Sequence, residues 1–221
     1  MGDVAQKGES EFGPAEETLL DLQLKGAGLT PYSRSADGRA VLRSSIREFL
    51  ASEAMFYLGV PTTRAASLVV SEESKVMRDK LYDGNAMAEK CAVVLRVAPN
   101  FMRFGSFEIF LPQDMRTQRA GPSHGMKDQM LEPMVNYLVS NFYPAIAQSF
   151  PEENVAMRAK VMFEEITKRT AEMVATWQCV GFCHGVLNTD NMSLMGLTID
   201  YGPYGFMDHF DPEHICNHSD D

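Results

Sequence analysis

The feature that most constrains the fold of this 221-residue chain is a change in hydrophobic periodicity close to Gly105. Before it, several short segments alternate apolar and polar residues or are rich in β-branched residues, as strands are. These segments span residues 20–24, 65–70, 75–78 and 91–98. After it, apolar residues recur at helical spacing over residues 107–110, 130–140 and 154–176. We therefore predict an α+β fold, with a flexible lead-in at residues 1–19, a β-rich region at 20–104 and a mainly helical region at 105–221.

One helix is predicted inside the β-rich region, over residues 41–58. Apolar residues including Leu42, Ile46 and Leu50 recur there at helical spacing, and Gly59 ends the helix. The sequence Tyr-Asp-Gly-Asn at residues 82–85 is typical of a hairpin turn. These elements predict a small antiparallel sheet that carries one helix. A cleft between such a unit and the helical region is a common place for a ligand.

The composition narrows the possible functions. With 20 Lys and Arg against 30 Asp and Glu, the formal net charge is −10, which argues against broad electrostatic binding to nucleic acid or to an anionic membrane. No apolar run approaches the roughly 20 residues that span a bilayer. Residues 1–17 carry five acids and one lysine, unlike a secretory signal or an Arg-rich transit peptide. Because the chain as a whole is acidic, any site for an anion must be a local cluster of cations.

A lysine and a glutamate form the first candidate pair. Lys25 stands at the end of the first predicted strand, and Glu48 lies in the middle of the helix that follows. A strand lysine held by a helix carboxylate is how kinase-like folds place a cation against nucleotide phosphates. The alternative is a surface lysine and an unrelated solvated glutamate.

Two arginines near the end of the β-rich region form the second candidate. Arg96 and Arg103 each sit among apolar residues. A buried arginine needs an anion beside it, because an unpaired buried charge is costly, and guanidinium groups bind phosphate oxygens well. The alternative is that both arginines point outward from an edge strand.

The third candidate is a polar segment between His184 and Asp200, predicted to be a loop followed by two short strands around a glycine turn. It places Asp190, Asn191 and Asp200 close together, and carboxylate and amide oxygens are ligands that Mg²⁺ accepts while it also binds phosphates. A second carboxylate beside such a metal can take a proton from an attacking hydroxyl. The alternative is a pair of Asx turns in a hairpin loop.

Several long blocks of this sequence resemble the selenoprotein O family. They are LQLKGAG at residues 22–28, ADGR at 36–39, LRSSIREFL at 42–50, RFGSFE at 103–108, FCHGVLNTDNMS at 182–193 and TIDYGP at 198–203. The resemblance covers residues 20–221. It implies a protein-kinase-like, two-lobed fold and protein adenylyltransferase activity, in which AMP moves from Mg²⁺-bound or Mn²⁺-bound ATP to Ser, Thr or Tyr hydroxyls of proteins.

The resemblance also implies a role for each candidate residue. Lys25, held by Glu48, would bind ATP phosphates together with Arg96 and Arg103. Asp37 and Gly38 would lie in a loop that touches the nucleotide. Asn191 and Asp200 would hold the metal, and Asp190 would accept the proton. His184 is the competing candidate for the base. The position at which an ordinary kinase loop has its base is Val186 here, and because valine cannot accept a proton, the base must be another residue.

The chain also departs from the family pattern. Of the glycine-rich loop that normally precedes the lysine strand it retains only Gly2-Asp3, and the C-terminal half of the family lies beyond Asp221. The chain is therefore expected to be a fragment or a truncated product. A non-catalytic nucleotide-binding module is the alternative function. The family resemblance predicts a mitochondrial protein, and a cytoplasmic one is the alternative.

Overall fold

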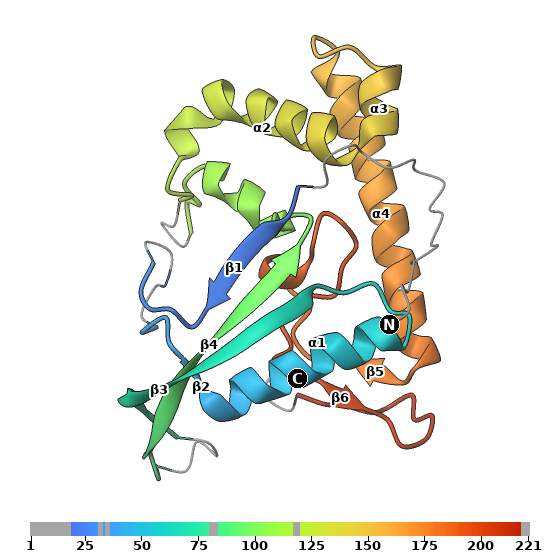
Figure 1. The fold of residues 1–221 in the computed structure, drawn as a ribbon. Helices are drawn as coiled ribbons and strands as arrows, with labels where there is room; N and C mark the ends of the chain where they lie inside the picture. Colours follow the sequence, from blue (N-terminus) through green and yellow to red (C-terminus); the bar gives the residue numbers. More distant parts are fainter. Residues whose placement is uncertain (1–18, 31–32, 34–35, 80–83, 117–119, 218–221) are drawn as a thin grey trace, which may run out of the picture.

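The computed structural model describes residues 19–30, 33, 36–79, 84–116 and 120–217. The expected lead-in, except residue 19, and the Gly2-Asp3 remnant lie outside the described residues. The first half of the chain forms a sheet with one helix, and the second half is mainly helical (Figure 1). The fold is thus α+β, as predicted. The elements, in chain order, are β1 (Asp21–Lys25), β2 (Ala40–Val41), α1 (Leu42–Tyr57), β3 (Arg64–Arg78), β4 (Met87–Ala98), the 3-10 helices η1 (Phe104–Phe110) and η2 (His124–Met126), α2 (Lys127–Phe142), α3 (Pro144–Ser149), α4 (Val155–Cys179), β5 (Phe182–Cys183), the 3-10 helix η3 (Thr189–Asn191) and β6 (Gly205–Phe206).

The sheet is built around β4, which pairs antiparallel with β1 and β2 along one side and with β3 along the other. The prediction of two separate strands at residues 65–70 and 75–78 is wrong, because β3 runs through both. Register shifts at Ala65/Ser67 and Val70/Lys75 mark irregular pairing within this single strand. The expected turn at residues 82–85 lies partly outside the described residues, between the paired strands β3 and β4.

Helix α1 confirms the predicted helix, but its buried face mixes polar and apolar residues. Its buried residues are Ser45, Glu48, Ala51, Ser52 and Met55, which follow helical spacing. The apolar residues that predicted the helix include Ile46, Leu50 and Tyr57, which are 43%, 62% and 79% exposed. Glu48 meets charged side chains of the sheet, whereas Ala51 and Met55 pack into an apolar core with residues that include Trp177. The helix therefore contacts both the charged cluster and an apolar core.

The helical region has its own apolar core. Residues of α2, α3 and α4, among them Leu138, Ile146 and Ile166, pack with Leu194 from the loop after β5. The residues predicted to be helical at 107–110 belong to the 3-10 helix η1. Among the described residues, no helix is both long and apolar enough to cross a membrane.

The segment from His184 to Asp200 differs from the prediction, since it forms no regular strand pair. β5 pairs instead with β6. The segment contains η3 and takes part in two isolated bridges, one between Thr62 and Thr198 and one between Arg103 and Ser193. These single bridges attach the loop to the segment just before β3 and to the residue before η1. The loop is therefore fixed between the two halves of the chain by contacts that sequence periodicity does not reveal.

Candidate functional site

Asp200 lies at the centre of a cluster of ion pairs. Its Oδ1 is 2.9 Å from Lys25 Nζ and accepts a hydrogen bond from Arg96 Nη1, and its Oδ2 is 3.2 Å from Arg103 Nη2. Lys25 comes from the end of β1, Arg96 from β4, and Arg103 from the segment just before η1. Three cations from different parts of the fold thus converge on one carboxylate.

Glu48 provides the second carboxylate of the cluster. Its Oε2 lies 2.6 Å from Lys25 Nζ, and its Oε1 lies 3.0 Å from Arg96 Nη1. Glu48 is 5% exposed and Arg96 is 4% exposed, so neither is a solvated surface charge. Arg96 pairs with two carboxylates, and it lies on β4, which has neighbouring strands on both sides. These two facts exclude the alternative of an arginine that points outward from an edge strand.

The cluster keeps an excess of positive charge. Lys25, Arg96 and Arg103 carry three positive charges, against two negative charges on Glu48 and Asp200. The Nε of Arg96 is buried and has no hydrogen-bond partner within the described part of the chain. The cluster therefore combines one excess positive charge with an unpaired buried donor, in a chain whose net charge is −10. Such a group of cations suits a bound anion.

The cations also keep Asp200 ionised. Burial acts to raise the pKa of Asp200, but the positive charges of Arg96, Lys25 and Arg103 outweigh it and hold the pKa well below its usual range. The backbone of Asp200 adopts the left-handed region, with φ of 63°, a conformation that asparagine and aspartate tolerate better than other non-glycine residues. Such local strain requires support from the surrounding structure.

That support comes from the residues just before Asp200. The Thr198 hydroxyl accepts a hydrogen bond from Trp177 Nε1 at 2.7 Å and lies 2.8 Å from the carbonyl oxygen of Pro61, to which it donates. The Thr198 backbone N–H also donates to Pro61, and its carbonyl accepts from Thr63. Helix α4 and the segment just before β3 therefore hold the part of the chain that carries Asp200.

A chain of hydrogen bonds links Asn191 to the same segment. Asn191 Nδ2 donates to the Val186 carbonyl at 2.8 Å, and the Val186 N–H donates to His184 Nδ1 at 3.3 Å. His184 Nε2 lies 2.9 Å from the carbonyl of Ile199, the residue before Asp200. These partners assign the proton to Nε2 and make the ring neutral. Burial lowers the pKa of His184 below 6.5, which agrees with this neutral state.

Asp190 lies next to the start of η1. A Cβ added at Gly105 would be 2.6 Å from Asp190 Oδ1, so the carboxylate rests against the glycine. The Asp190 N–H donates to Asn188 Oδ1 at 3.0 Å, and the neighbouring Thr189 hydroxyl donates to Glu108 Oε1 at 2.5 Å. Asp190 itself is exposed. These contacts hold a solvent-accessible carboxylate against Gly105, which is two residues along the chain from Arg103 of the cation cluster.

Asp37 and Gly38 were expected beside the nucleotide, but the structure pairs Asp37 elsewhere. Asp37 Oδ1 lies 2.7 Å from Arg78 Nη2, at the end of β3. The hydrogen bond from Arg78 is the main cause that lowers the pKa of Asp37 to about 2. Gly38 has φ of 67°, and its carbonyl accepts from the Gly28 N–H at 3.1 Å. The Asp37–Gly38 segment thus braces the turn after Lys25, and its contact with a nucleotide stays a prediction.

Asn191 and Asp200 offer oxygens that suit a hard cation. Asn191 uses its amide nitrogen for Val186, which leaves Oδ1 as the acceptor atom of that side chain, and Asp200 is ionised. Within the described residues, no group of three or more His, Cys, Asp or Glu side chains could hold a metal by itself. The donor set therefore fits Mg²⁺ or Mn²⁺ only if phosphate oxygens or water complete the coordination.

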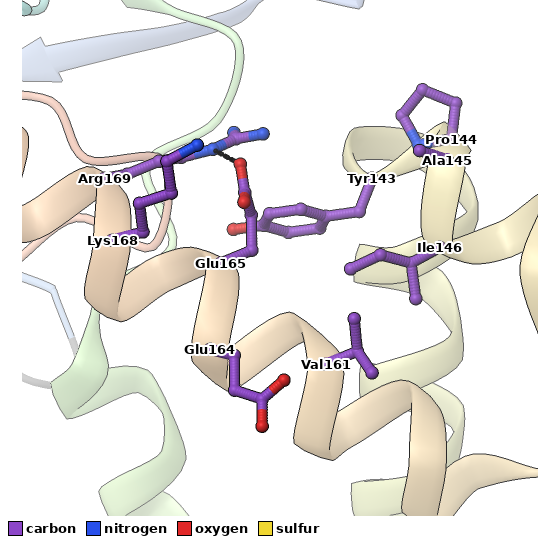
Figure 2. Close-up of a pocket in the computed structure, with 9 residues that line it drawn as sticks. All are labelled: Tyr143, Pro144, Ala145, Ile146, Val161, Glu164, Glu165, Lys168 and Arg169. Carbon is purple, nitrogen blue, oxygen red and sulfur yellow. Dashed lines mark hydrogen bonds and ion pairs between the residues drawn. The ribbon is translucent and has the colours of Figure 1, made fainter.

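Two cavities lie in the helical region rather than at the cluster. One, of about 370 Å³, is lined by the start of α3 and by α4 (Figure 2). Its wall includes Tyr143, whose hydroxyl donates to the Leu194 carbonyl, and Arg169, whose Cβ would lie 2.5 Å from a Cβ added at Gly196. This cavity thus borders the turn between Asn191 and Asp200. The other, of about 480 Å³, is mostly apolar and lies between η1, α2 and α4.

Sequence reasoning missed one residue of the cluster. Gln23 Oε1 accepts a hydrogen bond from Arg96 Nη2, and Gln23 is paired with Arg96 in the register of β1 and β4. The signal was available, because Gln23 stands two residues before Lys25 on an alternating strand and so shares its face.

Comparisons with known proteins show what the chain is similar to. The chain matches the family described as "Protein adenylyltransferase SelO" over residues 8–221. It is 61% identical over its whole length to "Protein adenylyltransferase SelO, mitochondrial" of Mus musculus and 60% identical to the Homo sapiens protein of that name, covering 33% and 32% of their lengths. It is 52% identical to "Protein nucleotidyltransferase YdiU" of Bordetella petrii over 90% of the chain and 37% of that protein. The chain thus spans about a third of the length of these relatives.

Proposed function

Because the chain belongs to the SelO protein adenylyltransferase family, we propose that it takes part in the transfer of AMP from ATP to protein hydroxyl groups. The observation that carries this proposal is the convergence of Lys25, Arg96 and Arg103 on Asp200. With Glu48 counted as the second carboxylate, one positive charge remains in excess. A triphosphate needs such a group of cations, and the acidic chain provides one at this place.

The cations are proposed to bind the phosphates. Lys25 is a point charge held by Glu48, and the two guanidinium groups can each give paired hydrogen bonds to phosphate oxygens. Phosphate oxygens would replace part of the contact that the cations now make with Asp200. That exchange releases carboxylate oxygens of Asp200 for a divalent cation.

Asn191 and Asp200 are proposed to hold that cation, Mg²⁺ or Mn²⁺. A bound divalent ion would neutralise charge on the phosphate oxygens. Asp200→Ala is expected to remove metal-dependent nucleotide binding while most of the fold remains. Titration of the variant with ATP, with and without Mg²⁺, measures this, and an unchanged effect of Mg²⁺ on ATP affinity would contradict the assignment.

Asp190 is proposed to accept the proton. In the reaction the substrate hydroxyl oxygen forms a bond to the α-phosphorus, the bond between that phosphorus and the oxygen that bridges to the β-phosphate breaks, and pyrophosphate leaves. The hydroxyl proton passes to the Asp190 carboxylate. Asp190 is exposed and therefore open to a protein substrate, whereas His184 is buried and uses both ring nitrogens in hydrogen bonds. This difference favours Asp190 as the base.

A protein-kinase-like, two-lobed arrangement belongs to the same proposal, with the boundary near residue 104. It is supported by the sheet with α1 on one side of that boundary and by α2 to α4 on the other (Figure 1). We extend the mitochondrial location from the names of the mouse and human relatives. Imaging of the tagged full-length protein tests the location, and a purely cytoplasmic signal would contradict it.

ATP labelled separately at the α- and γ-phosphates tests the proposed reaction. The expected result is transfer of the α-label to protein, with release of pyrophosphate. Transfer of the γ-label alone would contradict adenylyl transfer and indicate a kinase. ATP binding by a folded sample without any transfer would instead support a non-catalytic nucleotide-binding module.

Two variants test the base. Asp190→Asn is expected to lower the rate of AMP transfer by roughly 10²–10⁴-fold, the usual effect of losing a general base, with a much smaller change in ATP affinity. His184→Gln is the matched comparison in the same loop. If His184→Gln removes turnover while Asp190→Asn leaves the rate near that of the wild type, the base is His184.

A further inference from the structure

Among the residues that the structure describes, Gln23 is the neutral side chain that accepts a hydrogen bond from a cation of the cluster. It lies on β1 opposite Arg96 of β4, and its Oε1 accepts a hydrogen bond from Arg96 Nη2. The other terminal nitrogen of Arg96, Nη1, faces both Glu48 and Asp200. Gln23 therefore fixes the second arm of a guanidinium that is 4% exposed.

The neutrality of this acceptor decides the charge of the site. A glutamate has nearly the same shape as glutamine and could accept the same hydrogen bond from Arg96. It would, however, add a third carboxylate beside Glu48 and Asp200 and cancel the excess positive charge. Glutamine orients the arginine and leaves that charge available.

We propose that Gln23 is a positioning residue that holds the Arg96 guanidinium while preserving the net positive charge with which the cluster binds polyphosphate. This inference rests on the proposed function, because it assumes that phosphates bind at the cluster. It adds a residue to which neither the family match nor the resemblance gives a role.

Two substitutions separate positioning from charge. Gln23→Glu keeps an acceptor for Arg96 but adds a negative charge, so ATP affinity is expected to fall by about tenfold or more, a factor that corresponds to about 1.4 kcal/mol. Gln23→Met removes the acceptor and keeps the net charge. It leaves an N–H of Arg96 unpaired, so its main effect is a lower melting temperature, with a smaller loss of ATP affinity.

Leu22→Glu is the matched control. Leu22 precedes Gln23 on β1, is 66% exposed and points to the opposite face of the strand. The Leu22→Glu substitution therefore adds the same negative charge to the chain as Gln23→Glu, without placing that charge beside Arg96. Any general effect of a more acidic chain on ATP binding appears equally in Leu22→Glu and in Gln23→Glu.

The experiment measures binding of ATP, inorganic triphosphate and adenosine to the purified chain and its three variants, together with thermal unfolding. The inference predicts that Gln23→Glu weakens ATP and triphosphate but not adenosine, and melts at a higher temperature than Gln23→Met. It is overturned if Gln23→Glu binds triphosphate as Leu22→Glu does, or if Gln23→Met weakens it as much as Gln23→Glu. If the wild type binds neither ATP nor triphosphate, the proposed function fails instead. Separately, if Gln23→Met has the same melting temperature as the wild type, the positioning role is refuted.

Discussion

Replacing Asp200 by asparagine tests the electrostatic description of the site. The side chain keeps its size, but it loses the charge that faces Lys25, Arg96 and Arg103. Three cations then share the single carboxylate of Glu48. Two of the five groups, Arg96 and Glu48, have side chains that are only 5% and 6% exposed, so water cannot compensate for the missing charge at these two groups.

The magnitude follows from this burial. Removal of one partner from a buried ion pair costs about 3–5 kcal/mol, because the other partner is left buried and unpaired. Asp200 is 17% exposed at its side chain, and the cations retain Glu48, so we expect the lower end, about 3 kcal/mol. In a chain of this size that corresponds to a fall in melting temperature of about 6–12 °C.

Urea unfolding of the two proteins across a pH series is the assay. The folded pKa of Asp200 is held below that of the unfolded chain, so its stabilisation is complete above the unfolded value of about 3.9 and is lost as the pH falls through and below it. The stability difference between wild type and Asp200→Asn is therefore expected to be constant from about pH 8 to pH 5 and to shrink below about pH 4. Asp37→Asn, which breaks the exposed pair with Arg78, is the control and is expected to cost much less. Equal losses in the two variants, or a difference that grows on acidification, would refute the reasoning.

Two further predictions concern the loop. Burial lowers the pKa of His184, so its ring nitrogens should keep the NMR shifts of the neutral Nε2–H form more fully than an unfolded histidine does at about pH 6.5, where the unfolded ring is half protonated. The unfolded chain takes up a proton on this ring as the pH falls through about 6.5, so stability should fall there, and a folded His184 titrating above 6.5 would contradict the assignment. Gly105→Ala should slow AMP transfer by about 10²-fold through displacement of Asp190 while ATP binding remains, whereas Gly125→Ala, where an added Cβ meets nothing within 4 Å, should have no effect. Equal rates in the two glycine variants would show that the contact is unimportant.

Local patterns were sufficient for the elements that carry the cluster. The alternation that ends at Lys25 predicted β1, and the helical spacing around Glu48 predicted α1. The apolar residues around Arg96 indicated that its side chain either points outward or pairs with a buried anion. The structure shows that it pairs with the buried carboxylate of Glu48. These features depend on neighbours within a few residues, which a sequence shows directly.

Features that depend on distant contacts were not predictable in this way. Apolar residues of α1 such as Ile46 and Leu50 are exposed, whereas Glu48 is buried against the charged site, and only the tertiary arrangement reveals this. The loop between His184 and Asp200 is fixed by single bonds, such as that from Trp177 to Thr198, rather than by a strand ladder with a period. Asp37 pairs with Arg78, which is 41 residues away.

The most direct test of the central claim is an experimental structure of the chain with a non-hydrolysable ATP analogue and Mg²⁺. The account predicts phosphate oxygens within hydrogen-bond distance of Lys25, Arg96 and Arg103, and a metal ion that contacts Asn191 and Asp200. Asp200 should have given up at least one of its present contacts with the cations. Phosphates bound elsewhere, with the ion pairs of Asp200 intact, would contradict it.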